Sequence, residues 1–422
     1  DYPQAEEKLR QDAMRYGGDA LFRLQRYEEA AAAYDSLLQT FPRSPLCEEA
    51  RLWRGEAYAR LGYRGKHAGD AEKSRQWIEK AIADFESFLK TYPESKKMPQ
   101  ALAGLGFAYF DAENYPKAAE IFSRVVREFG LQTGAAPAAV DSRAEECQLY
   151  LAECFYRQKQ YETARLEYSR VLEQFPNGRF SVEARSGMAW CDYAIGKSLP
   201  VKGESLKKIA EAAEGFAAAA AMAKDQDRAL SCRFQAGCAF REAENFSRAV
   251  EEMRKVAEAD GHPQQAAAWC KYGVYAVEQA RLEAEKAQRA GPESDLGRAA
   301  EANRQRLLRE AAALLRRALA AGRLADADAA EAGTFLGEAC LDLKDYAAAA
   351  EAFAAVAEKY PQDERAPWAL YHLALALGEQ PGKLAEAKNA LQKLVMNYSK
   401  SRLYLQAAYL MADYQALSLI HI

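Results

Sequence analysis

The sequence predicts an all-α protein in which one helical hairpin recurs about nine to ten times, and three observations support this prediction. Segment 346–361 reads YAAAAEAFAAVAEKYP, with apolar residues three and four positions apart, as in a helix that buries one face. Pro361 ends this helix, because proline has no N–H and clashes with the preceding turn. The same pattern recurs at 27–42 and 161–176. The composition agrees, since half of the 422 residues are hydrophobic and only 14 are prolines.

A second pattern precedes each of these helices. Small residues occupy a first position and the positions five and seven residues later, and a large apolar residue often follows directly. Small side chains let another helix approach closely, and the large side chain fills the space beside it. The first positions of this frame are Ala13, Ala50, Ala101, Cys147, Ala184, Cys232, Ala268, Ala332, Ala369 and Ala407.

The spacing inside the hairpin is also regular. In five repeats, twelve residues separate the small residue at the fifth position from the first alanine of the following helix, as with Gly106 and Ala118. Together with Tyr109 and Phe122, these positions resemble the tetratricopeptide repeat. The resemblance covers nearly the whole chain and implies a right-handed superhelix, an α-solenoid whose hairpins share a continuous core. We therefore expect residues 1–416 to form a single solenoid.

The junctions between hairpins carry a further motif. Phe41-Pro42-Arg43-Ser44 and Tyr92-Pro93-Glu94-Ser95 look like the Tyr-Pro-x-Ser junctions of bacterial envelope repeat proteins. The groups that they resemble are the outer-membrane assembly lipoproteins and the periplasmic cell-division coordinators. This resemblance favours the bacterial periplasm or cell envelope over the cytoplasm.

Several repeats contain insertions. In the seventh, 38 residues separate Gly273 from Ala311 where twelve are usual. We expect both helices of this repeat to continue, over about 277–308, into a projecting hairpin with its turn at 291–294. A Gly-rich insertion spans 63–73, and a loop at 130–140 lengthens the junction before the fourth repeat.

The two ends depart from the pattern. The chain starts at Asp1 without Met or an apolar leader, so that a signal peptide could have been removed. The last six residues, 417–422, are what CTG TCT CTT ATA CAC ATC encodes, which resembles a common sequencing transposon adapter. We expect these six residues to be a non-native tail and the natural protein to continue beyond Ala416.

Catalytic chemistry finds little support in the sequence. Most of the eight cysteines stand where other repeats have small or medium core residues, which predicts a packing role, and no C-x-x-C pair supports a zinc or redox site. Cys238 and Cys270 lie off the frame and are candidates for exposure, and the even count leaves disulfides open. The histidines have no partner at metal or triad spacing. We expect no catalytic residue, cofactor or metal, and no enzyme activity.

A binding surface remains. In a tetratricopeptide superhelix the first helix of each hairpin lines a groove, and by resemblance the residues one and four positions after the conserved glycine point inward. In repeats three to five these positions hold Phe107, Phe110, Tyr156, Trp190 and Tyr193. If these rings face solvent, they form a site for an apolar or extended protein segment. The alternative is that the longer junctions rotate the helices and bury the rings.

The sequence argues against three kinds of interaction. The formal net charge is −4 without clustered Lys and Arg, which argues against nucleic acid. No apolar run is long enough to span a membrane. Arg15 and Asp19, and Leu52 and Glu56, stand where chaperone-tail clamps carry Lys and Asn, which disfavours recognition of a C-terminal carboxylate.

The leading hypothesis is thus a non-enzymatic scaffold that binds protein or peptide segments in a concave groove, with a role in bacterial cell-envelope assembly. A second hypothesis is a docking or regulatory region of a larger protein whose catalytic or membrane-anchored part lies outside this chain. A third is a structural array that assembles end to end. The oligomeric state stays open.

Overall fold

The computed structural model describes residues 2–129 and 142–420, with side chains for 5–129 and 143–416. Within these residues it contains 19 α-helices and no strand, and 81% of the chain is helical, which confirms the predicted fold class. The predicted loop at 130–140 and the last two residues of the predicted tail lie outside the described part. The final helix runs through residue 420.

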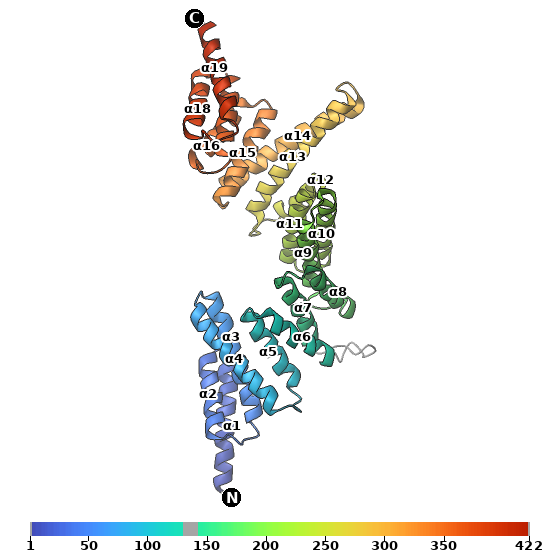
Figure 1. The fold of residues 1–422 in the computed structure, drawn as a ribbon, viewed down its shortest axis with the longest axis vertical. Coiled ribbons are helices and arrows are strands. Elements are labelled where there is room, and N and C mark those ends of the chain that lie inside the picture. The colour runs from blue at the N-terminus through green and yellow to red at the C-terminus, as the bar shows by residue number, and fades with distance from the viewer. Residues whose placement is uncertain (1, 130–141, 421–422) are drawn as a thin grey trace. The chain divides into compact units, whose positions relative to one another are not determined.

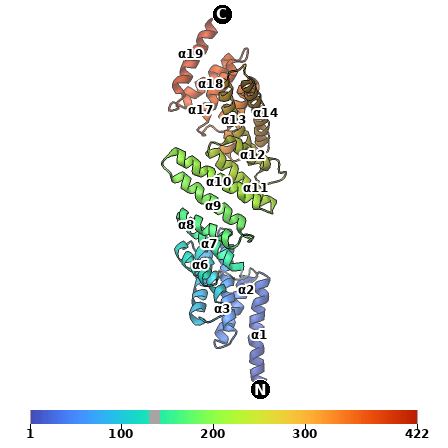
Figure 2. The same cartoon turned by 90° about the vertical axis from the view of Figure 1, so that its right-hand side faces the viewer.

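The chain divides into two compact units, residues 1–195 and 196–422 (Figure 1). Each unit is a row of antiparallel helix pairs, and Figure 2 shows the same pairing from the side. The first unit contains α1 (Tyr2–Arg23), α2 (Tyr27–Thr40), α3 (Cys47–His67), α4 (Ala71–Thr91), α5 (Met98–Asp111), α6 (Tyr115–Phe129), α7 (Ser142–Arg157), α8 (Tyr161–Gln174) and most of α9 (Ser181–Ser198). A single solenoid over 1–416 stays a prediction.

The second unit continues the alternation of first and second helices. It contains α10 (Lys202–Met222), α11 (Gln226–Glu242), α12 (Phe246–Ala257), α13 (Gln265–Ala290), α14 (Asp295–Ala320), α15 (Asp326–Asp342), α16 (Tyr346–Lys359), α17 (Ala366–Gly378), α18 (Leu384–Asn397) and α19 (Tyr404–Ile420). Consecutive helices pack on each other throughout this unit.

The turns inside five of the hairpins share one backbone conformation at the end of the first helix. In the five repeats with the twelve-residue spacing, the residue seven positions after the small residue has a left-handed φ of 60–62°. Its N–H and the next one bond back to the helix, as in Glu113 N to Phe110 O and Asn114 N to Tyr109 O, both 2.9 Å. This left-handed cap satisfies carbonyls at the helix end and turns the chain tightly. The five residues are Gln25, Glu113, Lys159, Glu244 and Lys344.

The core repeats the contact that the small-residue frame predicts. The ring of Phe353 is fully buried and lies directly on Gly337, so a side chain at Gly337 would overlap with it. Phe122 covers Gly106 and Tyr34 covers Gly18 in the same way. The frame positions therefore mark where the two helices of a hairpin touch.

The long insertion forms the predicted hairpin. α13 and α14 each have 26 residues and project side by side beyond their neighbours (Figure 1). Their turn starts at Gly291, with φ +83°, and Ser294 caps α14 by accepting from Gly297 N. The Gly-rich insertion at 63–73 is largely helical as well, because α3 and α4 continue into it. Gly62 and Gly65 lie against Ile78 and Ser74 of α4, so these glycines permit close helix packing.

The cysteines are mostly core residues. Seven of the eight are buried, and Cys238 is half-buried. The expectation that Cys270 could be exposed is wrong: it is fully buried where α13 packs on α15. None of the helices within 2–129 and 142–420 combines the length and the apolar character needed to span a membrane.

Candidate functional site

The candidate site lies on the first helices of the hairpins in the first unit. Each first helix has a small residue five positions after the start of its frame, for example Gly106. We call the residues one and four positions after this small residue the inner face. α1, α3, α5 and α7 carry this face, and contacts join α1 to α3, α3 to α5 and α5 to α7. The inner faces of these adjacent hairpins are therefore carried by helices in contact, although equivalent positions are 37 to 51 residues apart in the sequence.

The middle of this face is an aromatic cluster. Phe107 and Phe110 of α5 are half-buried, and both pack edge-to-face on Tyr150 of α7, with ring centroids 4.9 and 5.0 Å apart. Phe107 also meets Phe122 of α6 at 5.1 Å, and Phe110 meets Tyr115 at 5.4 Å. These two predicted site residues are thus brought together by a third ring.

Tyr150 is the ring that sequence reasoning missed. It lies three positions after Cys147, a position that the small-residue frame does not use. Burial raises its pKa, with smaller contributions from Glu146 and Asp111. The sequence does contain a sign of this position, because the second hairpin has another aromatic residue, Trp53, at the equivalent place. Trp53 packs on Phe22 with ring centroids 5.3 Å apart.

The other three predicted residues are also half-buried. Tyr156 packs edge-to-face on Tyr161 of α8 at 5.4 Å, and burial raises its pKa. Trp190 and Tyr193 of α9 pack edge-to-face on each other at 5.7 Å. The five rings therefore form three groups, which are partly packed and partly accessible. Their role in binding stays a prediction.

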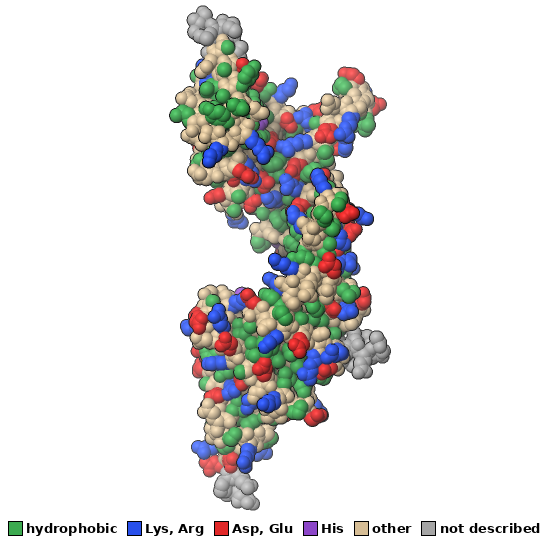
Figure 3. All heavy atoms as spheres, in the orientation of Figure 1, with side chains coloured by type: hydrophobic (Ala, Val, Ile, Leu, Met, Phe, Trp, Pro, Cys, Tyr) green, Lys and Arg blue, Asp and Glu red, His purple; other side chains and the backbone are tan. Residues whose placement is uncertain are grey.

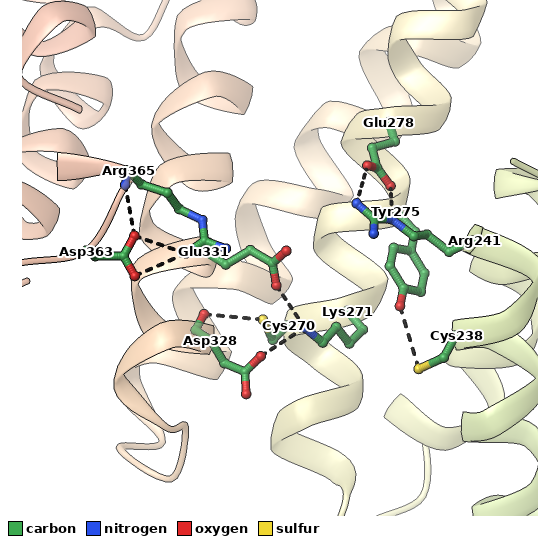
Figure 4. A network of polar contacts seen from close by, with 10 residues as sticks. All are labelled: Cys238, Arg241, Cys270, Lys271, Tyr275, Glu278, Asp328, Glu331, Asp363 and Arg365. Atoms are coloured by element: carbon green, nitrogen blue, oxygen red, sulfur yellow. Dashed lines mark hydrogen bonds and ion pairs between the residues drawn. The ribbon is translucent and has the colours of Figure 1, made fainter. Parts of the chain in front are cut away.

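In the second unit, ion pairs connect three successive first helices, α11, α13 and α15. Lys271 of α13 lies between Asp328 and Glu331 of α15, at 2.9 and 2.8 Å (Figure 4). These two carboxylates raise the pKa of Lys271 although burial opposes them. Arg241 of α11 forms a paired contact with Glu278 of α13 at 2.9 and 3.2 Å. The network ties α11 to α13 and α13 to α15.

The same network includes thiols. The Tyr275 hydroxyl donates to Cys238 Sγ at 3.7 Å, and Cys270 Sγ donates to the Asp328 carbonyl at 3.7 Å (Figure 4). Burial raises the pKa of both cysteines, to about 12 for Cys270. A thiol with so high a pKa is protonated at neutral pH and is a poor nucleophile.

The described histidines, cysteines and carboxylates do not gather into a metal-binding group. In this part of the chain, no group of three or more His, Cys, Asp or Glu side chains could hold a metal ion. His67 lies against its own helix, with Nδ1 2.8 Å from the Tyr63 carbonyl, and His372 does the same with Trp368 at 3.0 Å. The visible face in Figure 3 mixes both signs of charge with hydrophobic side chains.

These features define a helical repeat protein with an extended surface formed by its first helices. A model of the tetratricopeptide repeat matches residues 17–78, 66–132, 234–295 and 294–364, and a second model of that repeat matches 146–178 and 368–401. The chain belongs to the tetratricopeptide repeat family, whose members generally mediate protein–protein interactions.

Comparison with solved structures finds other tetratricopeptide repeat proteins. The C-terminal part of a tetratricopeptide protein from Cytophaga hutchinsonii shares 11% identity, covers 75% of this chain and 99% of its own, and has a TM-score of 0.47. A tetratricopeptide protein from Parabacteroides merdae shares 12% identity over 77% and 98%, with a TM-score of 0.39. YrrB, described as having an unusual peptide-binding site, shares 18% identity over 56% and 97%, with a TM-score of 0.34. A search of curated protein sequences gave no match.

Proposed function

We propose that the chain is a non-enzymatic scaffold that binds segments of partner proteins on the inner face of its first unit. The observation that carries this proposal is the aromatic cluster of Phe107, Phe110 and Tyr150, which is half-buried on the first helices. Such partly packed rings offer rigid apolar contact area at low entropic cost. In the second unit, by contrast, Lys271 and Arg241 already have carboxylate partners.

A more specific proposal concerns the cellular context in which the scaffold acts. The Tyr-Pro-x-Ser junctions support a role in bacterial cell-envelope assembly, with a protein or peptide segment as the partner and no nucleic acid. The second candidate is a docking region of a larger protein, and the family supports both, since tetratricopeptide arrays serve as interaction modules in either context. Sequencing the intact gene separates them: a lipobox or signal sequence ahead of Asp1 favours the first, and a catalytic continuation favours the second.

Binding is tested by capture. The chain is immobilised, a bound protein is identified by mass spectrometry, and its affinity is then measured with purified components. Phe107→Ala and Trp190→Ala should each weaken binding while the far-UV circular dichroism stays unchanged. Leu166→Ala is the control, because Leu166 is 51% exposed on α8, away from the inner face. Loss of helicity in Phe107→Ala would instead identify this ring as a structural residue.

A further inference from the structure

Acidic side chains recur at the first of the two inner-face positions. This position comes directly after the small residue, as Asp19 comes after Gly18. Five first helices have an acid there; Asp413 of α19 is exposed, and three of the other four acids have a partner. The Tyr34 hydroxyl donates to Asp19 at 2.8 Å, and the Tyr168 hydroxyl donates to Glu153 at 2.7 Å. Glu338 is paired with Arg281 of the preceding hairpin. The repeat therefore shows how a carboxylate at this position is normally satisfied.

Glu56 of the second hairpin is the exception. Among the described residues it has no hydrogen-bond or ion-pair partner. The cause is a single atom: Phe85 covers Gly55 as Tyr34 covers Gly18, but Phe85 has no hydroxyl. Burial raises the pKa of Glu56, and the guanidinium groups of Arg60 and Arg143 oppose this effect only in part. A partly buried carboxylate without a donor is unfavourable for the folded chain alone.

The surroundings of Glu56 differ from those of its counterparts. Four positions after the small residue, the other hairpins of the first unit carry rings, which are Phe22, Phe110, Tyr156 and Tyr193. The second hairpin has Ala59 instead. The next first helix, α5, contacts α3 and carries Phe107 and Phe110. A half-buried carboxylate that accepts no hydrogen bond from the described residues thus lies beside a methyl group and next to a helix that bears two aromatic rings.

We propose that Glu56 receives the ammonium or guanidinium group of a Lys or Arg side chain from the bound protein segment. The aliphatic stem of that side chain passes Ala59, and the rings of α5 provide apolar contact and attraction for the cation. The charged end supplies the donor that Phe85 lacks. Arg60 lies four residues along the same helix and is exposed, so it can move aside. This inference rests on the proposed function, since it names the chemistry that the same face selects.

The test uses a peptide library on the full chain. Twelve-residue peptides with one fixed central residue, which is Lys, Arg, norleucine, Gln or Glu, and otherwise mixed sequence are passed over the immobilised protein. Retained peptides are quantified by mass spectrometry. We expect Lys and Arg pools to be retained about tenfold more than the norleucine pool, the size of one charge-assisted hydrogen bond.

Two variants place the effect at Glu56. Glu56→Gln should abolish the preference for Lys and Arg. Phe85→Tyr should weaken it, because the new hydroxyl supplies an internal donor. The chain shows that this tyrosine fits: Phe85 lies against Gly104 of the next first helix as Tyr168 lies against Gly187. Glu153→Gln is the matched control at the same repeat position, and it should keep the preference because Glu153 already has its donor.

The outcomes separate the two proposals. If peptides are retained but all five pools bind equally, or if Glu56→Gln keeps the Lys and Arg preference, the inference is wrong and the proposed function stands. If the chain retains no pool at all, the proposed function fails and the inference fails with it.

Discussion

Gly17 and Gly337 both lie inside helices, yet the structure gives them opposite roles. A methyl group added at Gly17 would meet no atom within 4 Å, whereas one added at Gly337 would overlap with the ring of Phe353. Alanine favours a helix over glycine, so the surroundings decide the sign of the change.

Gly17→Ala should raise the free energy of unfolding by about 0.5–1 kcal/mol, because it removes only the entropic cost of glycine. Gly337→Ala should lower it by about 1–3 kcal/mol, because the ring of Phe353 must move. Urea titration followed by circular dichroism measures both values. Equal effects of the two substitutions would contradict the contact between Gly337 and Phe353.

The pH dependence of stability at Glu56 can be derived from its raised pKa. Burial raises this pKa above the ordinary 4.5, so the folded chain binds the proton more tightly than the unfolded chain does. The favourable term is complete below pH 4.5 and is lost as the pH rises through the folded pKa. At pH 7 the ionised carboxylate therefore lowers stability.

Glu56→Gln should accordingly raise the melting temperature at pH 7 and leave it unchanged at pH 4, where both variants are neutral. Glu153→Gln should give no such gain, since Glu153 accepts from Tyr168. Thermal unfolding at the two pH values measures the difference. A lower melting temperature for Glu56→Gln at pH 7 would mean that Glu56 has a partner in solution.

At the scale of the helix and its turn, the left-handed residues are the informative feature. Lys344 has φ +62° and its side chain is exposed, while Gly322 has the same φ of +62° and no atom near a would-be side chain. Only glycine adopts this conformation without strain. The two positions therefore form a matched pair within one unit.

Lys344→Gly should stabilise the chain by about 0.5–1 kcal/mol, and Gly322→Ala should destabilise it by about 1–2 kcal/mol. Both changes leave the core untouched, so the slope of the urea transition should stay constant. If Lys344→Gly proved destabilising, the turn after α15 would not have the left-handed cap.

The helices can be predicted well from the sequence because the same pair of contacting residues occurs in many hairpins. Phe353, Phe122 and Tyr34 each lie the same number of positions after a glycine. The packing seen in one hairpin therefore predicts the packing in the others. The prediction is weaker where a position departs from that average. The segment 63–73 is rich in glycine, and only its packing on α4 shows that it continues a helix. Glu56 and Phe85 are each unremarkable in sequence, and only the missing hydroxyl makes their pairing informative.

At the scale of the whole chain, each hairpin contacts mainly its neighbours, so a local defect should stay local. Phe353→Ala removes a fully buried ring and should cost about 3–5 kcal/mol. Hydrogen exchange with mass spectrometry should show lost amide protection in α15–α18 and unchanged protection in α2–α8. Met396→Ala is the control, since Met396 is 72% exposed. Lost protection across both units would reveal a globally cooperative fold.

The projecting hairpin has a practical consequence. α13 and α14 are anchored at their base, where Arg304 of α14 meets Asp342 of α15 at 3.3 Å, while their turn at 291–294 stands clear of the stacked repeats. A fluorescent protein could be grafted between Pro292 and Glu293 without disturbing the core. Such a fusion would allow the scaffold to be followed by microscopy in living cells while both ends of the chain stay unmodified.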